Sequence, residues 1–107
     1  MRDCFVYIPT NKSRDVFYVR VTNDLQRRMS QHAEAQLGFA GRYNLRLLVH
    51  VEQFADAKSA IAREKQLKGW RRSKNIALIT RSNPHWDDLA EGYYRSFDEL
   101  RMTNSET

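Results

Sequence analysis

Two side chains that can bind a phosphate lie one helical turn apart early in the sequence. Arg28 and His32 are four residues apart, and Leu25 and Met29 recur beside them at helical spacing. The residues 22–24, Thr-Asn-Asp, offer side-chain oxygens that can cap the first N–H groups of a helix. A helix that begins there and presents Arg28 and His32 on one side is suited to holding a phosphate.

A carboxylate occupies an apolar register in a second expected helix, residues 56–68, which ends at Gly69 as the residue just past the helix. Its inward stripe consists of Ala57, Ala60, Ile61, Glu64 and Leu67. Carboxylates rarely enter such a stripe without a partner. Glu64 therefore marks either a functional site or a structural pair with an arginine at the edge of the core.

Two tyrosines lie on the strands of an expected hairpin, residues 4–9 and 16–22, with its turn at residues 11–13. Alternation places Cys4, Val6 and Ile8 on one face, and Phe17, Val19 and Val21 on the matching face of the return strand. Tyr7 and Tyr18 then share the opposite face, beside Arg28. Tyrosine is also common on half-buried sheets, so packing is the alternative role for each.

The remaining expected elements are a helix over residues 24–36, a central strand over 46–54, a helix over 70–81 and a short helix over 86–93. His50 lies in the central strand, where we interpret it as a packing residue. Ser73 is the expected N-cap of the helix over 70–81. Its inward residues are Ile76, Leu78 and Ile79.

The charge is distributed unevenly along the chain. The net charge is +5, but residues 1–82 carry 16 Lys and Arg against 7 Asp and Glu, whereas residues 83–107 carry 2 against 6. The densest basic patch surrounds Trp70, and comprises Lys65, Lys68, Arg71, Arg72 and Lys74. A basic body with an acidic tail favours a polyanionic partner such as nucleic acid.

Length and composition exclude several classes of protein. The 107 residues suit a single domain, expected at 1–93 with an acidic, partly disordered tail at 94–107. The single cysteine, Cys4, excludes an intrachain disulfide and a cysteine-based zinc cluster, and fits a reducing cytoplasm. We expect no signal peptide and no membrane-spanning segment, hence a cytoplasmic protein that does not engage a membrane.

Several segments in order match a known pattern. These are Phe5-Val6-Tyr7, Tyr18-Val19-Arg20, VTNDLQRRMSQH, RYNLRLLVHVEQF, AIAREKQLKGWRRSKNIALI and NPHW. Over residues 3–90 the chain resembles the GIY-YIG nuclease superfamily, particularly its small stand-alone bacterial members. The resemblance implies an α+β fold, a small three-stranded antiparallel sheet flanked by helices. It also implies cleavage of phosphodiester bonds with Mg²⁺ or Mn²⁺.

The same resemblance assigns roles to individual side chains. Tyr7 matches the tyrosine that activates the attacking water, and Tyr18 matches the second motif tyrosine, which lines the site. Arg28 matches the arginine that steadies phosphate charge, and His32 the histidine one turn later. Glu64 matches the metal-binding carboxylate. Asn83 matches, more loosely, an asparagine near the site.

The chain departs from the family pattern at three positions. Phe5 and Arg20 replace the motif glycines, and Val21 stands where some members carry a basic residue. A glycine permits close approach of backbone or substrate, so Arg20 either clamps the phosphate or blocks the site.

The sequence thus predicts a metal-dependent DNA endonuclease. The expected DNA contacts are Arg20, Arg27, Lys65, Lys68, Arg71, Arg72 and Lys74. One alternative is a nucleic-acid-binding module that has lost catalysis. Another is a small interaction protein whose charge is incidental.

Overall fold

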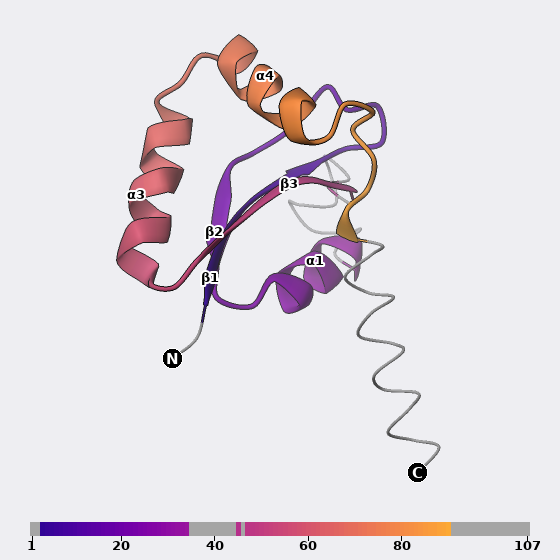
Figure 1. Ribbon diagram of the computed structural model, residues 1–107. Helices are drawn as coiled ribbons and strands as arrows, with labels where there is room; N and C mark the ends of the chain where they lie inside the picture. Colours follow the sequence, from indigo (N-terminus) through magenta and orange to yellow (C-terminus); the bar gives the residue numbers. More distant parts are fainter. Residues whose placement is uncertain (1–2, 35–44, 46, 91–107) are drawn as a thin grey trace.

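A computed structural model describes residues 3–34, 45 and 47–90 of the chain. Its elements in chain order are β1 (Cys4–Thr10), β2 (Arg20–Thr22), α1 (Leu25–Glu34), β3 (Leu47–Phe54), α3 (Ala57–Lys68) and α4 (Arg72–Ser82). The strands form an antiparallel sheet in the order β2-β1-β3. Helices α3 and α4 lie on one side of this sheet and α1 on the other (Figure 1). The predicted α+β fold is confirmed.

The two faces of β1 bury different sets of side chains, as the alternation predicted. Cys4, Val6 and Ile8 pack with side chains of α3 and α4, including Leu67 and Ile79. On the other face, Tyr7 packs with Leu25 and Met29 of α1 and Leu48 of β3. Helix α1 therefore covers the face that carries Tyr7.

The hairpin is more irregular than expected. Strand β2 has only three residues, because the predicted strand from Val16 contributes a single bridge, Thr10 to Phe17, before regular pairing begins at Arg20. Pro9 lies in the central strand, where it has no N–H to donate, and the register with β3 shifts between Ile8 and Pro9.

Side-chain caps begin two of the helices. The Asp56 carboxylate accepts a hydrogen bond from the Ser59 N–H at 2.7 Å at the start of α3. At the start of α1, the Asp24 carboxylate accepts from the Arg27 N–H at 3.2 Å. These caps fix where each helix leaves the sheet.

Several predicted details of α3 and α4 are wrong. Gly69 does end α3 at the predicted position, but as a C-cap residue with φ of −80°, a conformation that needs no glycine. Arg71, without a side-chain cap, precedes α4 in place of Ser73. Ile61 and Ile76 are 41% and 36% exposed, since α3 and α4 each bury a narrower stripe than expected.

The predicted helix over residues 86–93 does not begin at Trp86, because residues 86–89 are not helical and Ala90 is the first helical residue. Trp86 has φ of 53°, in the left-handed region, so no helix begins there. The rest of the predicted helix, the end of the helix over 24–36 and the predicted tail at 94–107 extend outside the described residues. Within the described ranges, no helix is both long and apolar enough to cross a bilayer.

Candidate active site

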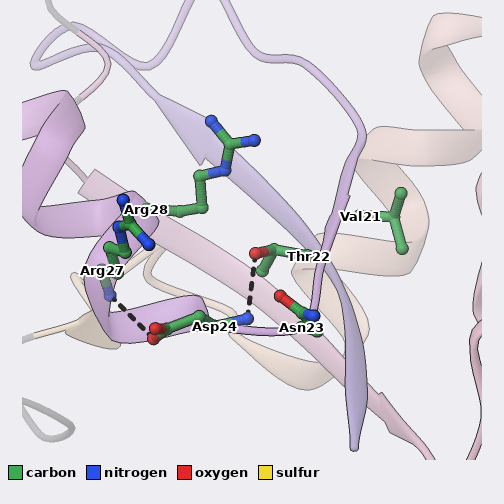
Figure 2. Close-up of a pocket in the computed structure, with 6 residues that line it drawn as sticks. All are labelled: Val21, Thr22, Asn23, Asp24, Arg27 and Arg28. Carbon is green, nitrogen blue, oxygen red and sulfur yellow. Dashed lines mark hydrogen bonds between the residues drawn. The ribbon is translucent and has the colours of Figure 1, made fainter. Parts of the chain in front are cut away.

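A polar cleft opens where β2 joins α1. It has a volume of about 410 Å³ and is lined by Val21, Thr22, Asn23, Asp24, Arg27 and Arg28. The Thr22 hydroxyl accepts a hydrogen bond from the Asp24 N–H at 3.0 Å, and Asp24 caps α1, so the joint is held by its own polar side chains. Figure 2 shows the side chains of Arg27 and Arg28 on one side of this joint, with Val21 pointing away. The cleft therefore presents two guanidinium groups to a ligand.

Tyr7 lies beneath this region, in the central strand. It is 2% exposed and packs against Leu25, Met29 and Leu48. Burial raises the pKa of its hydroxyl above the ordinary value, and the positive charges of Arg28 and Arg20 partly oppose that rise. Both arginines thus act electrostatically on the same phenol, one from α1 and one from β2.

The antiparallel pairing of β1 with β2 positions Arg20. It is the cross-strand partner of Tyr7, and it is exposed. Its guanidinium carbon lies 5.2 Å from the centroid of the Tyr18 ring, a cation–π contact. Tyr7, Tyr18, Arg20 and Arg28 therefore form one group of neighbouring side chains from β1, β2, α1 and the chain before β2.

Glu64 comes from the other side of the sheet. Its carboxylate is paired with the Lys68 ammonium one turn later, at 3.5 Å, and its side chain is 16% exposed. Helix α3 packs against β1 and also against the edge strand β2. A substrate that contacts both Glu64 and Arg28 therefore has to pass around an edge of the sheet.

The Glu64 carboxylate suits a cation whose remaining coordination positions are filled by water and by the substrate. In the described part of the chain, no group of three or more His, Cys, Asp or Glu side chains can hold a metal ion. Mg²⁺ commonly takes only one or two carboxylates and fills its other positions with water and phosphate oxygens. The Glu64 carboxylate is half-buried, and Lys68 approaches its Oε2 at ion-pair distance. Glu64 therefore fits the role of such a single protein ligand.

Two further predicted site residues are His32 and Asn83. The side chain of His32 lies outside the described part. Asn83 is buried, and its amide bonds the Val49 carbonyl at 3.1 Å and both backbone groups of Asp87, at 2.9 and 3.0 Å. These bonds tie the end of α4 to β3 and to the chain that follows it.

The predicted DNA contacts lie in different surroundings. Lys65 and Arg71 are exposed, whereas Lys68 is paired with Glu64. Arg72 donates a hydrogen bond to the Asp15 carbonyl, and its guanidinium carbon lies 4.5 Å from the Phe17 ring centroid. Arg72 therefore attaches α4 to the hairpin and has fewer donors left for a phosphate.

Sequence reasoning missed a polar network on the α3 side of the sheet. Glu52 accepts hydrogen bonds from Arg63 Nε at 2.8 Å and Nη2 at 3.2 Å, and shares a third, of 2.8 Å, with His50 Nε2. His50 Nδ1 lies 3.2 Å from the Ser82 hydroxyl. Burial works against the Glu52 charge, yet the bonds and charges of Arg63 and His50 lower its pKa overall. The spacing of His50 and Glu52, two residues apart on one strand face, was the available signal.

Comparison with known proteins adds two matches. Residues 3–77 match the family model described as the GIY-YIG catalytic domain. Among solved structures, the chain is similar to the NMR structure of the UPF0213 protein BH0048 from Bacillus halodurans. The two share 26% sequence identity with a TM-score of 0.53, over 80% of this chain and 92% of that chain. No curated protein matches the sequence.

Proposed function

Because this chain belongs to the GIY-YIG family, we propose that it is a metal-dependent endonuclease that hydrolyses phosphodiester bonds in DNA. The observation that supports this most is the group formed by Tyr7, Arg20 and Arg28, in which two cations from different elements act on one buried phenol. Of these three residues, Arg28 also lines the polar cleft, where a phosphate can enter.

In this proposal the arginines bind the charge that develops on the phosphate. Hydrolysis of a phosphodiester gathers negative charge on the nonbridging oxygens, and a guanidinium can answer it with two parallel hydrogen bonds. Arg28 lines the cleft directly, so it is the primary clamp. His32, on the next turn of α1, is the further phosphate ligand that we propose on the basis of the family pattern.

Tyr7 is the proposed group that orients and activates the attacking water. Its hydroxyl keeps its proton in the free protein, since burial raises its pKa. Only the phenolate can act as a base, so Tyr7 Oη first loses this proton to solvent. Arg28 and Arg20 favour that phenolate, which then takes a proton from the attacking water. Tyr18 holds the Arg20 guanidinium by the cation–π contact and so positions the second cation.

Glu64 is the proposed ligand of Mg²⁺ or Mn²⁺. Such a cation, when bound, polarises the scissile phosphate and stabilises the leaving oxygen. Lys68 competes for the same carboxylate, at 3.5 Å, and is exposed enough to turn towards the DNA backbone instead. The cytoplasm is the proposed compartment, because the lone cysteine Cys4 is a free, buried thiol.

One observation favours a second function, a nucleic-acid-binding module without catalysis. Arg20 stands at a motif glycine position, and its side chain lies over Tyr18 on the face that carries Tyr7. There it excludes any group that the glycine would admit. The binding module would retain the cleft and its cations but not the turnover.

The deciding experiment measures cleavage of single-stranded, duplex and branched DNA with Mg²⁺, Mn²⁺ or EDTA. We expect metal-dependent cleavage by the native chain and its loss in Glu64→Gln, which keeps the size of the side chain. Lys58→Ala, an exposed change at the start of the same helix, is the matched control and should cleave normally. Cleavage that appears only after Arg20→Gly would establish the binding module instead.

A further inference from the structure

A second groove lies on the opposite side of the sheet from the cleft. It has a volume of about 210 Å³ and is lined by Trp70, Lys74, Ala77, Leu78 and Arg81. Its walls belong to α4 and to the turn before it, and it shares no lining residue with the cleft at the start of α1. The groove is therefore separate from the cleft, and Figure 1 shows α4 and α1 on opposite sides of the sheet.

The Trp70 ring forms the aromatic wall of this groove and is held in place from the α3 side. The Arg63 guanidinium carbon lies 5.2 Å from the ring centroid, and Arg63 is itself fixed by its two hydrogen bonds to Glu52. The ring also packs against the core while remaining partly exposed. Trp70 is thus oriented before any ligand arrives.

The second cation on this ring is differently held. The Lys74 ammonium lies 4.1 Å from the ring centroid. Lys74 and Arg81 are exposed, and in the described part of the chain neither has a carboxylate within ion-pair distance. Lys74 can therefore leave the ring without breaking an ion pair, and both cations are available to an anion.

We infer that this groove binds one unpaired base of a single-stranded nucleic acid, stacked on Trp70, with Lys74 and Arg81 on the flanking phosphates. This inference rests on the proposed nucleic-acid substrate but not on cleavage. It adds a contact that selects strands with exposed bases.

Size and chemistry both favour this occupant. The groove is smaller than the pockets that enclose whole small ligands, which suits one base of a longer chain. Stacking of a base on an aromatic ring is stronger than the contact of a lysine with an exposed ring, so a base can displace Lys74. The displaced ammonium then lies next to the phosphate that follows the base. A base inside a duplex presents no free face and cannot enter.

The test uses fluorescence of the full chain in EDTA, so that no metal-dependent cleavage occurs. Trp86→Phe leaves Trp70 as the only tryptophan. Titration with an oligothymidylate should quench Trp70, and a duplex of equal length should quench it far less. Quenching that is equal with duplex, or with polyglutamate at equal charge, would overturn the inference, as would no change in Trp70 emission on binding.

Variants measure the contribution of each contact. Trp70→Ala should weaken oligothymidylate binding about tenfold, while Trp70→Phe should recover most of the affinity and exclude a general loss of folding. Lys74→Ala and Arg81→Ala should each reduce the salt dependence of binding, whereas Lys58→Ala should not. Unchanged affinity in Trp70→Phe and Trp70→Ala alike would also overturn it.

The outcome is independent of the proposed catalysis. If Glu64→Gln and the native chain are equally inactive but Trp70 is quenched by single strands, only the endonuclease proposal fails. If the native chain cleaves DNA and Trp70 does not respond, only the present inference fails.

Discussion

The two faces of the sheet use charge differently. On the α3 and α4 face, Glu52 is bonded to Arg63 and His50, and Glu64 is paired with Lys68. On the α1 face, Arg20 and Arg28 surround the buried phenol of Tyr7, and the described residues provide neither with a carboxylate partner. Paired charges hold elements together, whereas cations without acids are available to a substrate anion. The paired charges of the α3 and α4 face thus stabilise the fold, and the cations of the α1 face belong to the proposed site. Glu64 has both characters, because it is paired with Lys68 and is also the proposed metal ligand.

The strongest test of this comparison removes Arg28, one of the two cations of the α1 face. Arg28→Ala should lower kcat for DNA cleavage by about 10²- to 10³-fold, because the phosphate loses a fixed guanidinium as its charge develops. Thermal unfolding should change little, since Arg28 is exposed.

Arg27→Ala is the matched control for that substitution, since Arg27 lines the same cleft one position earlier. We expect it to raise KM and to reduce the salt dependence, with a small effect on kcat. Equal losses of kcat in both variants would show that the cleft gathers charge without a specific clamp.

The corresponding change on the α3 face should affect stability and not chemistry. Arg63→Ala leaves Glu52 half-buried with only His50, so the free energy of unfolding should fall by about 2 kcal/mol. Urea denaturation measures this loss. Adding Glu52→Gln to Arg63→Ala should restore part of the lost stability. If the double variant instead loses the sum of the two single losses, Arg63 and Glu52 are not coupled.

The Tyr7 hydroxyl gives a smaller and more selective readout. Burial raises its pKa and the arginines oppose that rise, so Arg28→Ala and Arg20→Ala should each raise it further, Arg28→Ala by more. Ultraviolet titration measures the change, with Tyr7→Phe identifying its signal among the five tyrosines. If the phenolate takes the proton from water, the cleavage rate should rise with pH towards this pKa. A rate independent of pH over that range would remove Tyr7 from the proton transfer.

Glu52 should produce the smallest effect, a dependence of stability on pH. Its pKa is lower in the folded chain, so its stabilisation is fully present above the ordinary carboxyl value and is lost as pH falls through the folded-state value. Urea unfolding across the acid range should show this loss, and Glu52→Gln should make the curve flatter. An unchanged slope would mean that the pair with Arg63 is not formed in solution.

The sequence predicted what short-range periodicity controls. Alternation along residues 4–8 identified both faces of β1 correctly, because a strand buried on both sides must place each side chain in one of two layers. The residue types at 22–24 also indicated the cap at Asp24, and helical spacing indicated the half-buried position of Glu64.

Long-range contacts were not predictable in the same way. Arg63 lies among polar residues of a helix, and nothing local indicates that it reaches Glu52, eleven residues earlier on another element. The exposure of Ile61 depends on how far α3 rotates against the sheet, which periodicity leaves open. The convergence of Arg20 and Arg28 on Tyr7 likewise depends on the tertiary arrangement of β2 and α1.

Strand β2 is an edge strand of three residues with an exposed arginine at its start. Short length and a charged side chain are both features that discourage a second molecule from adding its own strand to an open sheet edge. We therefore expect Arg20 also to discourage a second copy from pairing with the β2 edge. Arg20→Gly, which would restore the family glycine, removes that protection and should make the chain more prone to aggregate at high concentration.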